Sequence, residues 1–298
     1  SGDVNGDGFS DVIIGAFEYR LSTTETYAGG VLVYYGGVGA FDGIATADMA
    51  QWLGRSGADQ GQSRLGGNVA AVDVNNDGFA DVFAAARYAF KVDSNSTGGV
   101  FGWYGSAAGP NGGEAGWTDN ADWTLSGSYT RQGMGNGEGV AFAGDLDGDG
   151  YNDIAVTAYD FDYNKPGDVF VFRGSATGLS ADADWHYRGG SSTTRVGVRA
   201  RCAGDLNADG YDDFVVSSRG IGDGSKVDYS ILVWYGGPEF FTTALVTEAD
   251  ADWSYSFPNA TTQWDQFVWV ADTGDITGDG YDDLFWGSSN FSDETAGY

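Results

Sequence analysis

Cysteine and histidine are almost absent from this sequence of 298 residues, which contains one of each, Cys202 and His186. A single cysteine excludes a disulfide bond within the chain. One cysteine and one histidine are also too few for a zinc site of the usual kind or a cysteine–histidine nucleophile. Cys202 shares the alternation of the apolar residues Val198 and Ala200, so we expect it to be a small buried core residue.

Positive charge is scarce as well, because 14 lysines and arginines face 43 acidic residues and the formal net charge is −29. A surface of this charge repels phosphate groups, so we expect no nucleic-acid partner and no binding to anionic membranes. No apolar run approaches the ~20 residues of a membrane-spanning helix, and we recognise no signal peptide. The chain opens inside a motif at Ser1-Gly2-Asp3, which indicates a processed or partial product.

Glycine and aromatic residues are abundant, with 50 Gly, 18 Phe, 17 Tyr and 10 Trp, and they frame a nine-residue repeat. Its five copies are DVNGDGFSD, DVNNDGFAD, DLDGDGYND, DLNADGYDD and DITGDGYDD, which start at residues 3, 73, 145, 205 and 275. The starts lie 70, 72, 60 and 70 residues apart, a near-constant period that is typical of repeat architectures. We therefore treat residues 1–298 as a single repeat domain or a segment of one.

Each copy sits in the same frame of four short segments, which we name strands A to D. Strand A precedes the motif, as at 68–72 and 139–143, and strand B follows it, at 12–14, 82–85, 154–156, 214–216 and 284–286. Strand C covers 30–35, 99–104, 168–172 and 229–235, and strand D contains Trp52, Trp123, Trp185 or Trp253. The segments are rich in Val, Phe, Tyr and Trp, and no stretch of twelve residues has a helical period. Four short antiparallel strands per repeat predict an all-β fold, a β-propeller with one blade per repeat.

Oxygen-bearing side chains occupy positions 1, 3, 5 and 9 of the motif, a spacing that lets one tight loop surround a hard cation. Glycine at position 6 permits the positive φ of a sharp turn, and position 7 would contribute its backbone carbonyl. An all-oxygen site with several carboxylates favours calcium over magnesium, and the chain would hold up to five calcium ions. The predicted ligands are Asp3, Asn5, Asp7, Phe9, Asp11, Asp73, Asn75, Asp77, Phe79, Asp81, Asp145, Asp147, Asp149, Tyr151, Asp153, Asp205, Asn207, Asp209, Tyr211, Asp213, Asp275, Thr277, Asp279, Tyr281 and Asp283.

Two other interpretations of the loop are weaker. A turn that binds nothing would leave three or four carboxylates within nine residues to repel one another. An EF-hand needs flanking helices and a glutamate at position 12, which here falls in an apolar strand. The loops hold sixteen carboxylates at ligand positions, and five calcium ions would bring the net charge from −29 to −19. We expect the third loop, with four aspartates, to bind tightest and the fifth, with Thr277 at position 3, to bind weakest.

These loops and their frame resemble the FG-GAP repeats of the integrin α-subunit propeller and of many secreted bacterial propellers. The resemblance covers essentially the whole chain. It implies that each calcium loop joins strands A and B on one face of a propeller that usually has seven blades. The GAP element appears without its proline, as in Gly15-Ala16-Phe17, and the FG element is degraded to Leu65-Gly66 or absent, so integrin-like partner binding is not carried over. About 17 strands are recognisable, a little over four blades. We therefore expect further propeller strands from the rest of a longer chain or from another subunit.

Partner contacts are predicted on the face opposite the calcium loops, in the connections from strand B to strand C. Arginine and tyrosine side by side suit a protein or glycan contact surface, although local packing of loop side chains explains them as well. The tryptophans of strand D could stack on sugars, but their place in a repeated strand favours packing between blades. The candidate contact residues are Tyr19, Arg20, Arg87, Tyr88, Tyr159, Phe161 and Arg219.

Three classes of function remain open. The first is a secreted or cell-surface, calcium-binding propeller that acts in adhesion or in protein or glycan interaction. The second is a structural repeat within a surface assembly or filament. The third is a polysaccharide lyase or hydrolase on a propeller scaffold, which would require a non-repeated acid/base pair in a cleft. We expect the first class and no enzyme activity.

Overall fold

The computed structural model describes residues 1–20, 28–39, 46–57, 62–92, 95–128, 133–136, 138–159, 166–190, 195–219, 227–260, 268–272 and 274–288. In these residues the regular structure is β-strand, accompanied by short 3-10 turns of three or four residues. None of these turns is long or apolar enough to span a membrane. The all-β class predicted from the sequence is confirmed.

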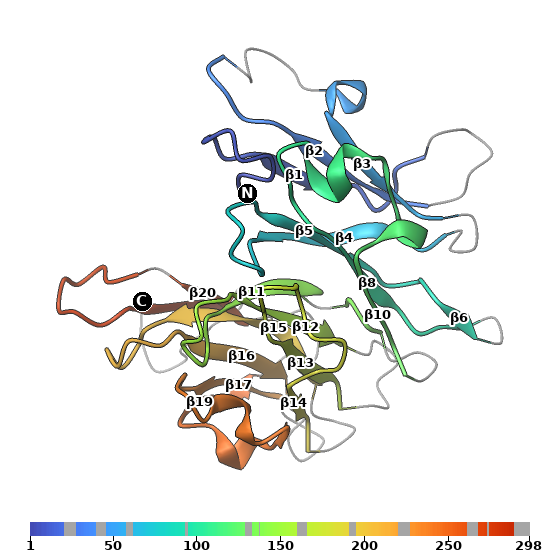
Figure 1. Cartoon of the computed structure of the whole chain (residues 1–298). Helices are drawn as coiled ribbons and strands as arrows, with labels where there is room; N and C mark the ends of the chain where they lie inside the picture. The colour runs from blue at the N-terminus through green and yellow to red at the C-terminus, as the bar shows by residue number, and fades with distance from the viewer. Residues whose placement is uncertain are drawn as a thin grey trace, which may run out of the picture.

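Of the six β-sheets in the described residues, five follow one another as successive blades, and we call them blades 1 to 5 (Figure 1). Blade 1 contains β1 (Val12–Gly15), β2 (Gly30–Tyr34) and β3 (Trp52–Arg55). Blade 2 contains β4 (Leu65–Val72), β5 (Asp81–Ala86), β8 (Gly99–Trp103) and β10 (Trp123–Ser126). Blade 3 contains β11 (Val140–Gly144), β12 (Asp153–Ala158), β13 (Asp168–Phe172) and β14 (Trp185–Arg188). Blade 4 contains β15 (Arg195–Gly204), β16 (Asp213–Arg219), β17 (Val227–Trp234) and β19 (Trp253–Ala260), and blade 5 contains β20 (Val268–Asp272) and β21 (Leu284–Ser288).

Within each blade, neighbouring strands are antiparallel and follow the predicted order A to D. The seventeen blade strands therefore match the predicted number in the described part of the chain. The A strands of blades 2 to 5 contact one another in chain order: β4 contacts β11, β11 contacts β15, and β15 contacts β20. The 3-10 turns lie in the connections from strand C to strand D: η1 (Ala47–Met49), η3 (Pro110–Gly113), η4 (Thr118–Asn120), η5 (Phe240–Thr242) and η6 (Glu248–Asp250).

Four short strands were not expected from the sequence. β6 (Lys91–Val92) and β7 (Asn95–Ser96) form a hairpin between strands B and C of blade 2. β9 (Gly116–Trp117) comes from the C–D connection of blade 2 but pairs in parallel with β3 of blade 1. β18 (Leu245–Val246) of blade 4 pairs in the same way with β14 of blade 3. The C–D connections therefore tie each of these blades to the blade before it.

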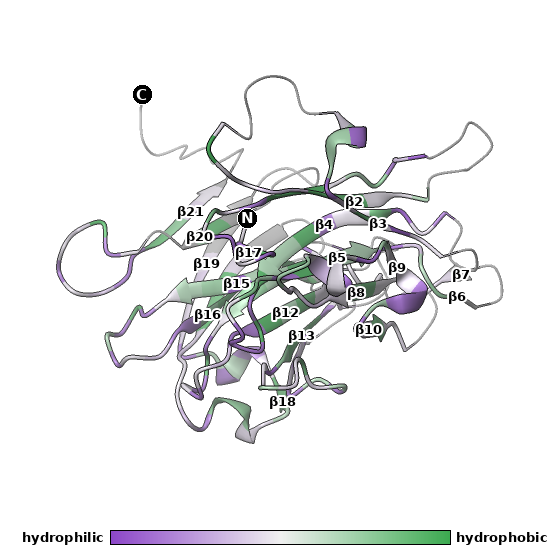
Figure 2. Ribbon diagram, turned by 45° about the horizontal axis from the view of Figure 1, so that its top comes forward, coloured by the Kyte–Doolittle hydropathy of each residue, from purple (hydrophilic) through white to green (hydrophobic). Residues whose placement is uncertain are grey.

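The hydrophobic core lies between the blades, because successive residues of a strand point to opposite faces of its sheet. In β5, Val82 and Ala84 pack against blade 1, whereas Phe83 and Ala85 pack against blade 3. Similar clusters lie between blades 3 and 4 and between blades 4 and 5. In Figure 2 the hydrophobic colour follows the strands and the hydrophilic colour gathers in the connections. Cys202 is buried, as predicted.

The tryptophans of strand D join consecutive blades, as predicted from their repeated position. Trp52 Nε1 donates a hydrogen bond to the Glu114 carbonyl (2.7 Å), and Trp123 Nε1 donates one to the Ser180 carbonyl (2.9 Å). Both carbonyls belong to the C–D connection of the following blade. Trp185 is 1% exposed, whereas Trp253 of blade 4 is 38% exposed.

Candidate metal sites

The first aspartate of every repeated loop holds the loop closed. Its two carboxylate oxygens accept hydrogen bonds from the backbone amides of positions 5 and 6. In loop 1, Asp3 Oδ1 accepts from Asp7 (3.1 Å) and Asp3 Oδ2 from Gly8 (2.8 Å). The same pair of bonds recurs in the other four loops. Five copies of one sequence motif therefore adopt one hydrogen-bonding pattern.

Positions 3 and 5 tighten the loop further. The side-chain oxygen of position 5 accepts the backbone amide of position 7 in all five loops. In loops 1 to 4 the side-chain oxygen at position 3 accepts the amide of position 5. The glycine at position 6 has a positive φ in every loop, between 88° and 92°, as predicted. Position 4 is also left-handed, even where it is Asn76 or Ala208, which the motif did not reveal.

The ninth position anchors each of the first four loops to its blade. Asp11, Asp81, Asp153 and Asp213 are buried. One carboxylate oxygen accepts the backbone amide of position 2, and the other accepts the amide of a glycine that is the second residue after strand C. Each carboxylate oxygen has two lone pairs, so these hydrogen bonds leave acceptor capacity for a cation.

The fifth loop differs, because its blade is described only as far as strand B. Asp283 accepts the backbone amides of Ile276 (2.8 Å) and Thr277 (3.0 Å), and it is partly exposed.

Burial makes the ninth-position carboxylates hard to ionise. It raises the pKa of Asp81 to about 7, of Asp153 to about 8 and of Asp213 to about 6, although backbone hydrogen bonds oppose the change. The other aspartates of the same loop raise these pKa values further. Burial also raises the pKa of Asp11. A cation held by the loop would offset both effects, so the residues present fit a metal site.

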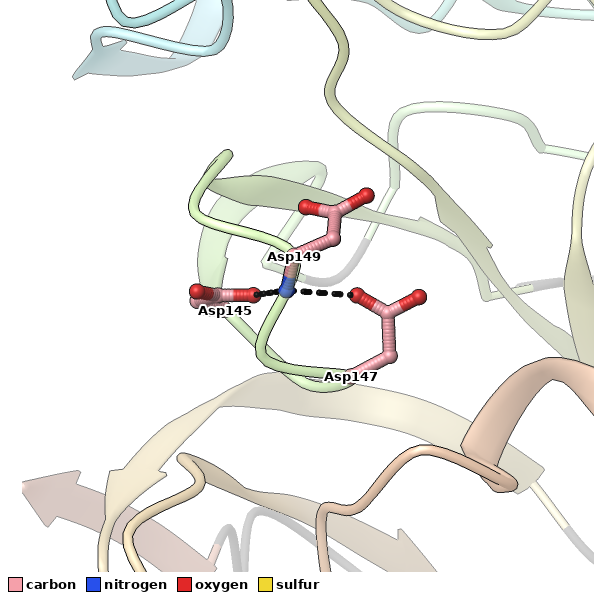
Figure 3. Close-up of side chains that lie close together, drawn as sticks. All are labelled: Asp145, Asp147 and Asp149. Atoms are coloured by element: carbon pink, nitrogen blue, oxygen red, sulfur yellow. Dashed lines mark hydrogen bonds between the residues drawn. The ribbon is translucent and has the colours of Figure 1, made fainter.

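Loop 3 brings three carboxylates together. Oxygens of Asp145, Asp147 and Asp149 lie within 4.8 Å of one another. Figure 3 shows the backbone amide of Asp149 donating to Asp145 Oδ1 (3.0 Å) and to Asp147 Oδ1 (3.3 Å), so the two carboxylates flank one peptide. Burial and the Asp149 charge raise the pKa of Asp147, while Arg173 lowers it. Clustered carboxylate oxygens are ligands that Ca²⁺ prefers.

Position 8 links the loops of neighbouring blades, a role that sequence reasoning missed. The backbone amide of Asp145 in loop 3 donates to Asp212 Oδ2 of loop 4 (2.9 Å). The amide of Asp205 in loop 4 donates to Asp282 of loop 5 in the same way (2.9 Å). Asn152 of loop 3 donates from its side chain to the Asp73 carbonyl of loop 2 (2.7 Å). The sequence did carry a signal for this role, because position 8 is polar in four of the five copies.

The predicted contact residues have different surroundings. The guanidinium carbons of Arg64 and Arg87 lie 5.1 and 4.7 Å from the centre of the Tyr88 ring, which is 40% exposed. Arg64 belongs to the D–A connection and was not predicted. Tyr19 is half-buried and Arg20 is exposed.

Of the three remaining contact candidates, the structure corrects the prediction for Tyr159 and adds little about Phe161 and Arg219. Tyr159 is 3% exposed, so its ring packs inside the described structure and is not available to a partner there. Phe161 lies outside the described residues, and Arg219 is the last residue of β16.

Comparison with known proteins adds independent support. The family model for the FG-GAP repeat matches residues 1–34, 136–172 and 267–298. Integrin alpha-IIb from Homo sapiens is 32% identical over 216 residues, which are 70% of this chain and 20% of the relative. Integrin alpha-V from Gallus gallus is 28% identical over 233 residues (74% and 19%). Integrin alpha-5 from Xenopus laevis is 28% identical over 248 residues (81% and 22%).

The chain spans about a fifth of the length of these relatives. The matched FG-GAP segments include loops 1, 3 and 5, and the blades have the strand order that a propeller requires. The chain belongs to the FG-GAP repeat proteins, and its fold is a β-propeller of the integrin α type, of which it contains about four to five blades.

Proposed function

We propose that the chain is a calcium-binding propeller that works outside the cell as an adhesion or interaction module for a protein or glycan partner. The observation that carries this proposal is the repeated loop, in which aspartates at positions 1 and 5 adopt the same hydrogen bonds five times. The side chains of positions 1, 3, 5 and 9 and the carbonyl of position 7 would hold the ion. Its charge would relieve the repulsion among the carboxylates.

Calcium would act on the stability of the blades. The ninth-position aspartate accepts an amide from its own loop and another from the end of strand C, so the loop and three strands share one anchor. A ligand that binds only the folded loop adds its binding free energy to folding. At a free calcium concentration 100 times the dissociation constant, each site would contribute about 2.7 kcal/mol. The proposed role is therefore to hold the propeller rigid in a calcium-rich environment.

The exposed surface at Tyr88 is the proposed contact region. The guanidinium groups of Arg64 and Arg87 both lie near the Tyr88 ring, which remains 40% exposed. Tyrosine and arginine are enriched in the residues that dominate binding at protein interfaces. Binding to an immobilised panel of matrix proteins and glycans should fall at least tenfold in the Arg87→Ala/Tyr88→Ala variant. Equal binding by this variant and the wild type would remove the face from the proposal.

An enzyme function finds less support in the described structure. A hollow of about 560 Å³ lies among β4, β11 and β15. Its lining contains one acidic residue, Glu138, which forms an ion pair with Arg201 and accepts the backbone amide of Ala200 (3.0 Å). A glycosidase-type mechanism uses two carboxyl groups. The lining of this hollow therefore does not supply the acid pair that such an enzyme would need.

Thermal unfolding tests the calcium part of the proposal. The melting temperature should rise by about 10 °C or more when excess chelator is replaced by excess calcium, because several sites contribute. Magnesium at the same concentration is the control and should give a smaller rise. Calorimetric titration should show up to five calcium ions per chain. An identical melting temperature in chelator and calcium would refute calcium binding by the folded loops.

A further inference from the structure

One residue breaks the pattern of the blades next to the third loop. The residue after the strand C segment is Tyr35 in blade 1, Tyr104 in blade 2 and Tyr235 in blade 4, but it is Arg173 in blade 3. Each directly precedes the glycine whose amide holds the ninth-position aspartate of the loop. All four side chains therefore start beside a calcium loop.

The first two tyrosines turn away from their own loop and enter a turn of the following blade. Tyr104 Oη accepts the backbone amide of Leu179 (3.1 Å). A Cβ atom added at Gly178 would lie 1.9 Å from Tyr104 Oη, and one added at Gly109 would lie 1.9 Å from Tyr35 Oη. The slot for the tyrosine hydroxyl therefore requires glycine in the turn.

Blade 4 has no glycine at this place. The turn bond from Gly109 to the Ser106 carbonyl (2.7 Å) corresponds in blade 4 to the bond from Phe240 to the Gly237 carbonyl (2.9 Å). Phe240 thus stands where the other two turns have glycine, and its ring stacks on Trp185 with a centroid distance of 5.8 Å. A side chain at this turn position closes the slot that a tyrosine at position 173 would need.

Arg173 turns instead to the carboxylates of loop 3. Its Nη2 contacts Asp147 and lies 3.0 Å from Asp149 Oδ2. The guanidinium carbon also lies 5.1 Å from the centre of the Phe241 ring of blade 4.

The guanidinium takes a place that an asparagine amide fills in three other loops. In loops 1, 2 and 4 the asparagine at position 3 donates from Nδ2 to Oδ2 of the aspartate at position 5, over 3.1, 3.0 and 2.8 Å. Loop 3 has Asp147 at position 3, which cannot donate when ionised. Arg173 supplies the donor to the corresponding oxygen of Asp149 and neutralises the additional carboxylate.

We propose that Arg173 is a built-in cation of loop 3 that competes with calcium for Asp147 and Asp149, so that this loop binds calcium more weakly than its four aspartates predict. This inference rests on the proposed calcium binding. It replaces the expectation that the third loop binds tightest. Arg173 also balances the additional carboxylate of loop 3 when calcium is scarce, whereas loops 1, 2 and 4 have a neutral asparagine at position 3 that supplies the donor itself.

The main test is a calcium titration of the full chain followed by amide NMR, with wild type compared with Arg173→Gln. The amide of Gly150 reports on loop 3, and that of Gly78 reports on loop 2 in the same sample, since both donate to the first aspartate of their loop. Removing a positive charge at contact range should lower the dissociation constant seen at Gly150 about three- to tenfold. The constant seen at Gly78 should stay within twofold of the wild type.

Matched variants separate the charge from other effects. Arg55→Gln removes the same charge from a site over the Trp117 ring, and it should leave the Gly150 midpoint unchanged. Arg173→Lys retains the charge and should stay within about threefold of the wild type. With Asp147→Asn in the background, Arg173→Gln should have a smaller effect, because the pair that it breaks is already gone. In chelator, Arg173→Gln should melt at a lower temperature than the wild type, the opposite direction to its effect on affinity.

The outcomes distinguish this inference from the proposed function. Tighter binding at Gly150 alone, with a lower melting temperature in chelator, supports competition by Arg173. Unchanged or weaker binding at Gly150 in Arg173→Gln overturns it, and so does a response at Gly78 without one at Gly150 in both proteins. If neither glycine responds to calcium in the wild type, calcium binding itself fails and the inference falls with it.

Discussion

Two buried aspartates of blade 3, Asp153 and Asp168, have opposite electrostatic surroundings. Each is the first residue of a strand, and they are 1% and 0% exposed. Burial alone would raise the pKa of Asp168, but hydrogen bonds from His186 Nε2 (2.7 Å) and Arg188 Nε (2.6 Å), with the charge of Arg188, bring it below its ordinary value. Burial raises the pKa of Asp153 to about 8, and the nearby loop carboxylates raise it further.

The two aspartates differ in the source of the positive charge that balances the ionised carboxylate. Asp168 has a cation within its own blade and is complete without any addition. Asp153 accepts the backbone amides of Leu146 and Gly174 and sits beside further aspartates, so its ionised form requires a cation from outside the blade's strands. The two buried acids of this sheet thus differ as a structural ion pair differs from a position that fits the proposed metal site.

The largest difference between the two should appear when Asp153 is removed. Asp153→Ala leaves the buried amides of Leu146 and Gly174 without their acceptor, at about 1–3 kcal/mol each, so we expect a loss of about 2–6 kcal/mol in chelator. The loss should be larger in calcium, because the variant also loses an ion ligand. Urea unfolding under both conditions measures the two values. Asp182→Ala, which removes an exposed acid from the same blade, is the control and should change stability by less than about 0.5 kcal/mol.

Asp168→Asn should give a smaller loss that is independent of calcium. The substitution keeps the shape but removes the charge that pairs with Arg188, and because Arg188 is half-exposed we expect about 1–3 kcal/mol. The rise in melting temperature from chelator to calcium should equal that of the wild type. A reduced calcium response in Asp168→Asn would show that the two acids belong to one electrostatic system and would remove the distinction between them.

The sequence predicted the features that recur from blade to blade better than the features that occur only once. The loop motif predicted the turn and the position of strand B, and the repeated place of tryptophan in strand D predicted the burial of Trp52, Trp123 and Trp185, because each blade repeats the same residues in the same strands. Asp153 was predicted as a ligand because it occurs in the motif. Asp168 begins a segment, Asp-Val-Phe-Val, much like the Asp-Ile-Ala-Val of Asp153, so local sequence could not distinguish them.

Contacts made across blades could not be predicted in the same way. Arg173 reaches loop 3 because Phe240, 67 residues further along the chain, fills the turn that accepts tyrosine elsewhere. The parallel pairing of β9 and β18 with earlier blades, and the bond from Asp212 to loop 3, likewise depend on the stacking of the sheets. Tyr159 was predicted as a contact residue because the connections from strand B to strand C are rich in aromatic and basic residues, but its side chain is buried.

The smallest expected effect is a difference in the pH dependence of the two acids in chelator. The folded pKa of Asp153 is raised from 3.8 to about 8, so its contribution to stability is complete below about pH 4 and is lost as the pH rises to 8. The folded pKa of Asp168 is lowered, so its contribution is present above about pH 4 and is lost only in more acidic solution.

Between pH 5 and 8 the wild type should lose stability as the pH rises. Asp153→Asn should reduce that slope by about a few degrees of melting temperature, whereas Asp168→Asn should leave it unchanged. Because the net charge of −29 also destabilises the folded state at higher pH, the informative quantity is the difference between each variant and the wild type. Equal slopes for the two variants would mean that burial does not oppose ionisation of Asp153, which would weaken the case that loop 3 needs an external cation.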